Sequence, residues 1–386
     1  MSKEKNIKQL LEAAKNRTTV KGYTHDFYNY PARFSPHFVR EAIKVFSKPN
    51  DLIIDPFVGG GTTLVEARLL NRHSIGFDVS SLATFIAKTK TTPLNPKEIN
   101  EIKKWSYETI SNLNCHLFTE RPSSWIEKGY QRNISTNQTW PTRKIIEQVI
   151  NEIDYSSFPI KIKNFLRCSV LKTGQWALDN KKEIPPASQF RIKLLENVLF
   201  MCDGATQFYN ALKDSDKNIE ALCINKSVSE IEKINALKKI KSPSLILTSP
   251  PYPGIHVVYH RWQIHGKKET PAPFWIANSL DGHGLTHYTM GGRKQKDLTN
   301  YFANILKTFH SIKKICSNET LIVQMLAFSD ASWQLPKYLD VMNIAGFTEV
   351  HFTRERIWRE VPNRKWYADK KGKTESSNEV ILFHRF

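Results

Sequence analysis

Acidic residues are scarce in this chain. Its 386 residues contain 37 Asp and Glu against 56 Lys and Arg, which gives a formal net charge of +19. So large a basic excess fits a polyanionic partner, and nucleic acid is the first candidate. An anionic membrane surface is the alternative, but the sequence has no basic amphipathic anchor, no lipidation motif and no apolar run long enough to span a bilayer. The composition therefore predicts a nucleic-acid partner and no membrane association.

Cysteine is also rare, and the few cysteines are scattered. The five are Cys115, Cys168, Cys202, Cys223 and Cys316. None belongs to a CxxC pair, so the pattern excludes both a disulfide framework and a zinc site. We expect reduced, mostly buried thiols and no bound metal.

The first residues, MSKEKNIKQLLEAAKNRTT, are charged almost from the start. They lack the apolar stretch and the small-residue cleavage site of a signal peptide. We therefore expect a cytoplasmic protein.

The periodicity of the chain predicts an α/β fold. Residues 51–90 read as strand, glycine-rich turn, helix and strand, which is one half of a doubly wound sheet. The rhythm resumes at residue 243 with a buried strand, SLILT, followed by an amphipathic helix and the strand LIVQMLAF. The apolar side of that helix carries Tyr301, Phe302, Ile305, Leu306, Phe309 and Ile312. After a further helix near residues 333–344, FTEVHFT and EVILFHR alternate as strands with no helix between them, which predicts an antiparallel closing hairpin.

The stretch from about 96 to 215 breaks the alternation of strand and helix. Apolar residues recur there at helical spacing, at Ile145, Ile146, Val149, Ile150 and Ile153, and again at Leu194, Leu195, Val198, Leu199 and Cys202. We interpret it as a mainly helical insertion that either recognises substrate or caps the sheet. The chain thus divides into residues 1–95 (a cofactor-binding half), 96–215 (the insertion) and 216–386 (a catalytic half).

The first motif is DPFVGGGTT. Its strand ends at Asp55, Gly59–Gly61 permit a turn with positive φ and close backbone approach, and Thr62 begins a helix. Such a turn binds nucleotide-like ligands, and the lack of a GKS or GKT ending disfavours a triphosphate. Asp78 ends the next strand, where a carboxylate can accept hydrogen bonds from both ribose hydroxyls. The alternative role of Asp78 is a helix N-cap.

The second motif is TSPPYPG, directly after the buried strand SLILT. Pro250 and Pro251 forbid helix and fix a rigid extended turn at the carboxyl end of that strand, where open α/β sheets bind ligands. The turn would present Ser249 and Tyr252 to a ligand. An ordinary proline-rich loop is the alternative, and the preceding glycine-rich turn argues against it.

Together the two motifs resemble those of the amino-methylating DNA methyltransferases, which modify cytosine or adenine amino groups. The family's DPF-x-G-x-G-T and SPPY or DPPY motifs match residues 55–62 and 249–252, and its FSP segment resembles residues 30–38. The similarity covers about residues 23–90 and 243–386. The motif order excludes the circularly permuted arrangement. The resemblance implies a Rossmann-like methyltransferase sheet and S-adenosyl-L-methionine as cofactor.

The resemblance also implies roles for particular residues. Catalytic roles fall to Ser249, Pro250, Pro251 and Tyr252. Cofactor contacts fall to Phe34, Asp55, Phe57, Gly59, Gly60, Gly61, Thr62 and Asp78. One departure is that the family usually has an acidic residue after its third strand, where the nearest stretch here offers Asn225 and Lys226.

The identity of Ser249 bears on the methylated base. Serine resembles the cytosine subgroup, whereas many adenine enzymes have aspartate, so we expect methylation of the cytosine amino nitrogen in double-stranded DNA after base flipping. The alternatives are an adenine amino methyltransferase, a methyltransferase of an RNA base or of a glutamine side chain, and a non-catalytic nucleic-acid-binding module. The net charge argues against a peptide substrate. Methylation of cytosine carbon five is excluded, because it needs a Pro-Cys nucleophile that the sequence lacks. A cognate restriction endonuclease, acting separately, is a further expected partner.

Basic residues alternate with aromatics in residues 258–268 and 354–373. Such runs can follow phosphates while aromatic rings cover bases, although a solvated face is the alternative. The candidate DNA contacts are Arg261, Arg293, Arg364 and Lys365.

Overall fold

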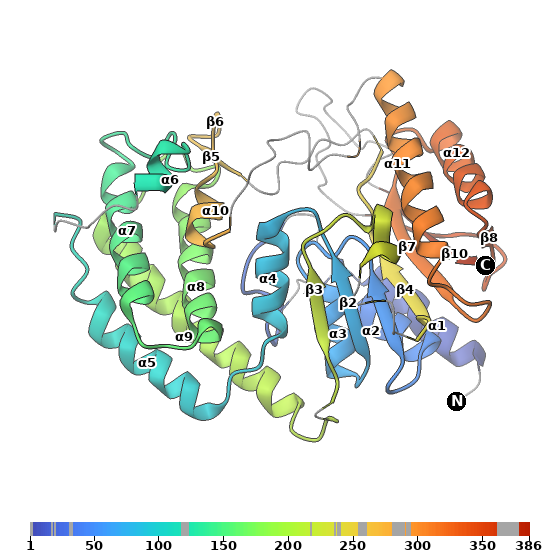
Figure 1. Cartoon of the computed structure of the whole chain (residues 1–386), viewed down its shortest axis with the longest axis horizontal. Helices are drawn as coiled ribbons and strands as arrows, with labels where there is room; N and C mark the ends of the chain where they lie inside the picture. Colours follow the sequence, from blue (N-terminus) through green and yellow to red (C-terminus); the bar gives the residue numbers. More distant parts are fainter. Residues whose placement is uncertain are drawn as a thin grey trace.

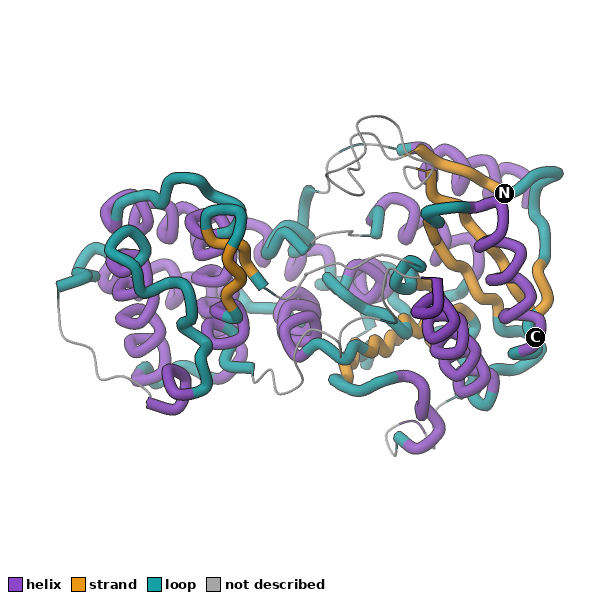
Figure 2. The backbone as a smooth tube through the Cα atoms, turned by 90° about the horizontal axis from the view of Figure 1, so that it is seen from above, coloured by secondary structure: helices purple, strands orange, loops and turns teal. Residues whose placement is uncertain are grey.

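The structure is a computed structural model. It describes residues 3–16, 18, 21–30, 34–116, 123–216, 218–234, 237, 241–253, 261–279, 290, 295–360 and 378–386. Figure 1 shows a sheet flanked by helices beside a second, helical body. Both ends of the chain lie with the sheet (Figure 2).

The sheet has the strand order β3-β2-β1-β4-β7-β10-β8, and β9 also pairs with β10. The first five strands in this order are parallel, and β10 runs antiparallel to β7, β8 and β9. The strands are β1 (Leu52–Asp55), β2 (His73–Phe77), β3 (Ala221–Ile224), β4 (Leu245–Thr248), β7 (Leu321–Ala327), β8 (Thr348–Glu349), β9 (Ile357–Glu360) and β10 (Asn378–Arg385).

Helices cover both faces of the sheet. Successive residues of its central strands point to opposite faces, and because these residues are apolar, both faces have to be buried. On β1, Ile53 packs toward α1 and α2, whereas Ile54 packs toward α11, α12 and η1. The same alternation holds on β4 and β7, which are buried along their whole length. The helical elements around the sheet are α1 (Lys3–Lys15), α2 (Pro36–Phe46), α3 (Thr62–Leu69), α4 (Ser81–Thr91), η1 (Val228–Lys233), α11 (Gln295–Lys313) and α12 (Ala331–Ile344).

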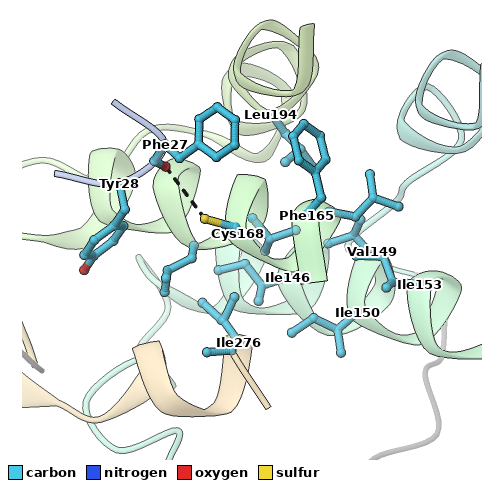
Figure 3. Close-up of a cluster of buried hydrophobic side chains, with 14 of the residues drawn as sticks. Phe27, Tyr28, Ile146, Val149, Ile150, Ile153, Phe165, Cys168, Leu194 and Ile276 are labelled. Atoms are coloured by element: carbon cyan, nitrogen blue, oxygen red, sulfur yellow. Dashed lines mark hydrogen bonds between the residues drawn. The ribbon is translucent and has the colours of Figure 1, made fainter. Parts of the chain in front are cut away.

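The helical body contains two separate parts of the sequence. Its helices are α5 (Pro96–Ile110), α6 (Ser123–Glu127), α7 (Trp140–Tyr155), α8 (Ile160–Leu178) and α9 (Ala187–Ala211), joined by β5 (Trp262–Ile264), β6 (Lys268–Thr270) and α10 (Ala272–Ile276). Residues from both parts share one apolar core, in which Ile276 lies near Ile146 and Cys168 (Figure 3). The hairpin β5–β6 therefore stands apart from the main sheet and among the helices (Figure 2).

Tight contacts fix the hairpin to the helices. The Trp262 indole N–H donates a 3.0 Å hydrogen bond to the Tyr28 hydroxyl. A Cβ at Gly174, near the C-terminal end of α8, would lie 2.6 Å from the Trp262 ring, so only glycine admits the indole there. Arg167 on α8 donates to the Ile276 carbonyl at 2.8 Å and pairs with Asp154. The sequence after β4 thus completes the helical body.

The predicted fold class is confirmed. The strands SLILT and LIVQMLAF, the helix between them, the antiparallel closing strands and the helical character of the insertion are all present. One strand prediction is wrong in extent, because FTEVHFT forms only the short strand Thr348–Glu349, followed by one further backbone hydrogen bond from Val350 to the Phe383 carbonyl at 2.9 Å. Phe352 turns away to pack against Phe46 and Phe383, at ring-centroid separations of 5.1 Å and 5.0 Å, and the chain leaves the sheet edge. β9 instead pairs with the first half of β10.

Among the described residues, no helix is long and apolar enough to cross a membrane. Within the same residues, no group of three or more His, Cys, Asp or Glu side chains is arranged to hold a metal ion.

Candidate active site

The glycine-rich turn lies between β1 and α3, at the carboxyl edge of the parallel strands. Gly59 and Gly61 have φ angles of +45° and +80°, which L side chains rarely adopt. A Cβ at Gly61 would lie 2.9 Å from the Cα of Ala87, and one at Gly60 would lie 3.1 Å from the Cβ of Tyr30. These glycines therefore let α4 and the Tyr30 segment approach the turn.

Asp78, directly after β2, holds the turn from the neighbouring strand. Its carboxylate accepts hydrogen bonds from the backbone N–H of Gly59 at 3.0 Å and of Ser80 at 2.9 Å. Burial raises the pKa of Asp78 to about 6. Each oxygen can accept a second hydrogen bond, so these contacts are compatible with ribose binding. The ribose role of Asp78 stays a prediction.

A buried lysine fixes the middle of the turn. Lys90, which is 1% exposed, donates from Nζ to the Gly60 carbonyl at 2.9 Å. Its own backbone carbonyl accepts a hydrogen bond from the Thr24 hydroxyl at 2.8 Å. Lys90 was not among the predicted site residues, because the run KTKTT at residues 88–92 reads as a solvated helix end and gives no sign that the ammonium group points inward.

Asp55 joins the glycine-rich turn to the second motif. One carboxylate oxygen accepts hydrogen bonds from the Phe57 backbone N–H at 3.1 Å and from the Thr248 hydroxyl at 2.7 Å. Asp55 and Thr248 are the last residues of β1 and β4, which are adjacent in the sheet. Burial raises the pKa of Asp55 to about 6. The side chain is only 3% exposed, and its predicted cofactor contact stays a prediction.

The second motif follows β4 at the same edge of the sheet. The Tyr301 hydroxyl, on α11, donates a 2.9 Å hydrogen bond to the Pro251 carbonyl. Ser249 donates from Oγ to the Tyr252 hydroxyl at 3.2 Å. The turn is therefore tied both to α11 and within itself, and Ser249 and Tyr252 lie together as the sequence motif suggested.

A carboxylate that the sequence analysis missed lies behind Tyr252. The Tyr252 hydroxyl donates a 2.7 Å hydrogen bond to Oε1 of Glu379, which is 2% exposed. Arg359 lies opposite Glu379 in the β9–β10 register, and its Nε is 2.9 Å from Oε2. Because β10 is antiparallel, the start of this strand lies at the carboxyl edge of β4 and β7.

Three further predicted cofactor residues lie at different depths. Phe34 is buried with the α1 and α2 side chains, and its ring lies 5.6 Å from that of Phe38. Phe57 is partly buried beside the α11 face, and Thr62 begins α3. Tyr30, from the same segment as Phe34, directly contacts the glycine-rich turn. The structure thus brings the Tyr30 segment to the turn, and the cofactor contact of Phe34 stays a prediction.

The predicted DNA contacts are only partly within the described residues. Arg261, which is half-buried, stands immediately before the β5–β6 hairpin. Arg293, Arg364 and Lys365 lie outside the described residues. Asn225, directly after β3, donates a 2.9 Å hydrogen bond to the Asp78 carbonyl.

The N-terminal part of the sequence is similar to a known protein family. Residues 2–89 match the N6/N4 methyltransferase family, described as DNA methylase. Type II methyltransferase M.MjaII of Methanocaldococcus jannaschii is 31% identical over 153 residues, which cover 38% of this chain and 27% of that protein. Type II methyltransferase M.BsoBI of Geobacillus stearothermophilus is 26% identical over 263 residues, which cover 59% of this chain and 49% of that protein. The chain thus matches less than half the length of these two relatives.

Solved structures give a more distant likeness. The rRNA methyltransferase AviRa from Streptomyces viridochromogenes has 10% identity and a TM-score of 0.37, covering 96% of this chain and 94% of that one. TrmN from Thermus thermophilus has 8% identity and a TM-score of 0.34, covering 94% of this chain and 52% of that one.

Proposed function

We propose that this protein transfers a methyl group from S-adenosyl-L-methionine to the exocyclic amino nitrogen of cytosine in double-stranded DNA. The observation that carries this proposal is the meeting of two motifs at one edge of the sheet. The glycine-rich turn follows β1, the Ser249–Tyr252 turn follows β4, and the 2.7 Å hydrogen bond between Thr248 and Asp55 joins them. The family match of residues 2–89 and the relatives' printed names support the broader class, a DNA methyltransferase of the N6/N4 type, and do not distinguish cytosine from adenine.

The glycine-rich turn fits the cofactor. Its positive φ angles expose backbone to a ligand, and Asp78 supplies a half-buried carboxylate at the end of the neighbouring strand. Asp78 would hold the ribose, while Gly59–Gly61 and Phe57 would line the path of the nucleoside and methionine parts. The bound cofactor supplies an electrophilic methyl group on a sulfonium ion.

The Ser249–Tyr252 turn would hold the flipped base. The ring of the base would stack on Tyr252. The Ser249 hydroxyl and the Pro250 carbonyl would accept the two hydrogens of its amino group, which leaves the lone pair of the amino nitrogen directed at the methyl group. The Pro251 carbonyl already accepts a hydrogen bond from Tyr301, which fixes the turn before a substrate arrives. The rate enhancement would come from this positioning.

The helical body would contact DNA through a basic surface near the hairpin. We call Lys181, Lys182, Lys267 and Lys268 the hairpin-tip surface. All four side chains are exposed. Asn180 donates to the Gln263 carbonyl at 2.9 Å, and His265 lies 3.1 Å from the Lys182 carbonyl, so the two loops are held together. Exposed lysines so arranged fit phosphates, and they support a target-recognition role for the insertion.

One experiment tests the proposed activity directly. The protein is incubated with cofactor and mixed-sequence DNA, the DNA is digested to nucleosides, and the products are identified by mass. N4-methylcytosine is the expected product. N6-methyladenine would keep the enzyme class and change the base, whereas the absence of any methylated nucleoside would refute the activity. A type II modification enzyme would act on the sites of a separate restriction endonuclease, and resistance of the methylated DNA to cleavage would reveal that partner.

A further inference from the structure

We infer that Glu379 is a positioning residue that makes Ser249 an obligate hydrogen-bond acceptor toward the substrate amine. The inference rests on the proposed methyl transfer and deepens it. Glu379 stands 127 residues beyond Tyr252 in the sequence and on the far side of β7 from the Ser249–Tyr252 turn. Its carboxylate nevertheless contacts Tyr252 directly.

The direction of the hydrogen bonds starts at Glu379. A carboxylate paired with a guanidinium only accepts hydrogen bonds, so the Tyr252 hydroxyl must donate its single hydrogen to Oε1, at 2.7 Å. The Tyr252 oxygen is then left as an acceptor for Ser249, whose Oγ lies 3.2 Å away. With its hydrogen committed to Tyr252, Ser249 presents only lone pairs outward.

This polarity matters for the chemistry of the turn. Both hydrogens of a base amino group need acceptors if its nitrogen is to become pyramidal. A free serine hydroxyl could rotate and donate instead, which would oppose the amine. The relay from Ser249 through Tyr252 to Glu379 removes that choice. It gives a neutral side chain the acceptor-only behaviour that an aspartate has by nature.

Arg359 makes the relay testable with a nearly isosteric change. Its guanidinium has donors only and lies 2.9 Å from Oε2 of Glu379. In Glu379→Gln the amide oxygen must therefore face Arg359, and the amide NH₂ must face Tyr252. The amide then donates to Tyr252, Tyr252 donates to Ser249, and Ser249 turns its hydrogen toward the substrate. One atom changes, and the polarity of the whole relay reverses.

The matched control is Glu349→Gln. Glu349 on β8 pairs with Arg356 at 2.7 Å, and its strand pairs with β10 at the opposite end from Glu379. This variant removes a second Glu–Arg pair from the closing strands without touching the Ser249–Tyr252 turn. We expect it to keep the parent kcat.

The experiment measures kcat, DNA KM and cofactor affinity for the parent, Glu379→Gln, Tyr252→Phe and the double variant. We expect Glu379→Gln to lower kcat by about tenfold or more, with cofactor affinity equal to that of Glu349→Gln. Tyr252→Phe keeps the aromatic ring but cuts the relay, so adding Glu379→Gln to it should cost little more.

A parent-like kcat in Glu379→Gln would overturn the inference. So would a double variant whose loss of kcat, expressed as free energy, equals the sum of the losses of the two single variants. If Glu379→Gln does not fold, Tyr252→Phe decides, because an unchanged kcat there excludes a relay through the hydroxyl. A parent enzyme that yields no methylated nucleoside would instead refute the proposed function itself.

Discussion

The hydroxyl of Thr248 donates a 2.7 Å hydrogen bond to the carboxylate of Asp55. It thereby joins the last residues of two adjacent parallel strands, each followed by one of the two motif turns. The relative position of the two turns depends on this buried contact.

Replacing Thr248 by valine should therefore affect both stability and activity. Loss of a buried hydrogen bond to a carboxylate lowers the free energy of unfolding by about 1–3 kcal/mol. Turnover should fall as well, because the two turns lose their common anchor. The control is Thr320→Val, which removes a hydrogen bond to the Pro243 carbonyl at the opposite end of β4. Urea denaturation measures the loss of stability in both variants, whereas we expect kcat to fall only in Thr248→Val. Equal losses of kcat would argue against a special role for Thr248.

Cofactor affinity should fall as the pH is lowered through about 6. Burial raises the pKa of Asp78 to about 6, and the ribose contact needs the ionised carboxylate. The same shift means that ionisation of Asp78 disfavours the folded state as pH rises from about 4 through about 6, so binding and stability should change in opposite directions. Calorimetric titration of the cofactor across this range provides the measurement.

Two variants of Asp78 complete that test. Asp78→Ala should weaken cofactor binding by about 1–3 kcal/mol, through loss of charge-assisted hydrogen bonds. Asp78→Asn should remove the inflection near pH 6. If the inflection persists in Asp78→Asn, the titrating group is Asp55, whose pKa is also raised to about 6.

Removing the side chains of the Ser249–Tyr252 turn should separate turnover from binding. Tyr252→Ala should cut turnover strongly while DNA affinity changes much less, because phosphate contacts dominate affinity. Ser249→Ala should lower turnover with cofactor affinity intact.

Duplexes that lack either every cytosine amine or every adenine amine identify the substrate base. Methyl incorporation that survives without cytosine amines would assign the enzyme to adenine.

The salt dependence of DNA binding should reveal the hairpin-tip surface. Replacing Lys181, Lys182, Lys267 and Lys268 by alanine should flatten the log–log salt slope by about 0.9 for each lysine that contacts a phosphate. Lys103 and Lys104 are the controls, because they pair with Asp203 and Glu108. They belong to α5, which lies at the other end of the helical body from β5 and β6 (Figure 1). If the fourfold variant has the same salt slope as the parent protein, the hairpin-tip surface does not contact DNA. The same titration of Arg364→Ala with Lys365→Ala tests the predicted contacts near the C-terminus.

Local chemistry made the two motif turns predictable from the sequence. Gly59 and Gly61 are needed for the positive φ angles, and Gly61 also for the close approach of Ala87. Pro250 with Pro251 prohibits a helix after β4. Glu379 could not be found in this way. Its contact with Tyr252 depends on the β7–β10 register, and its only local sign is an acidic residue at the start of an apolar strand.

The place of the β5–β6 hairpin was equally hidden. Its residues follow the Ser249–Tyr252 turn and would be expected to stay near the sheet, yet Trp262 packs into the helical body. Gly174 was the available clue, because a glycine inside a long helix costs about 1 kcal/mol unless packing requires it. Nothing in the sequence names Trp262 as the side chain that fills that position.

Because Trp262 and Ile276 belong to the core of the helical body, that core cannot close during synthesis until about residue 276 has left the ribosome. The sheet has to wait longer still, since β10 lies between β7 and β8 and follows both in the sequence. A nascent chain ending before residue 261 would expose the apolar site on α8 that Trp262 covers, and transiently exposed apolar surface of this kind promotes aggregation.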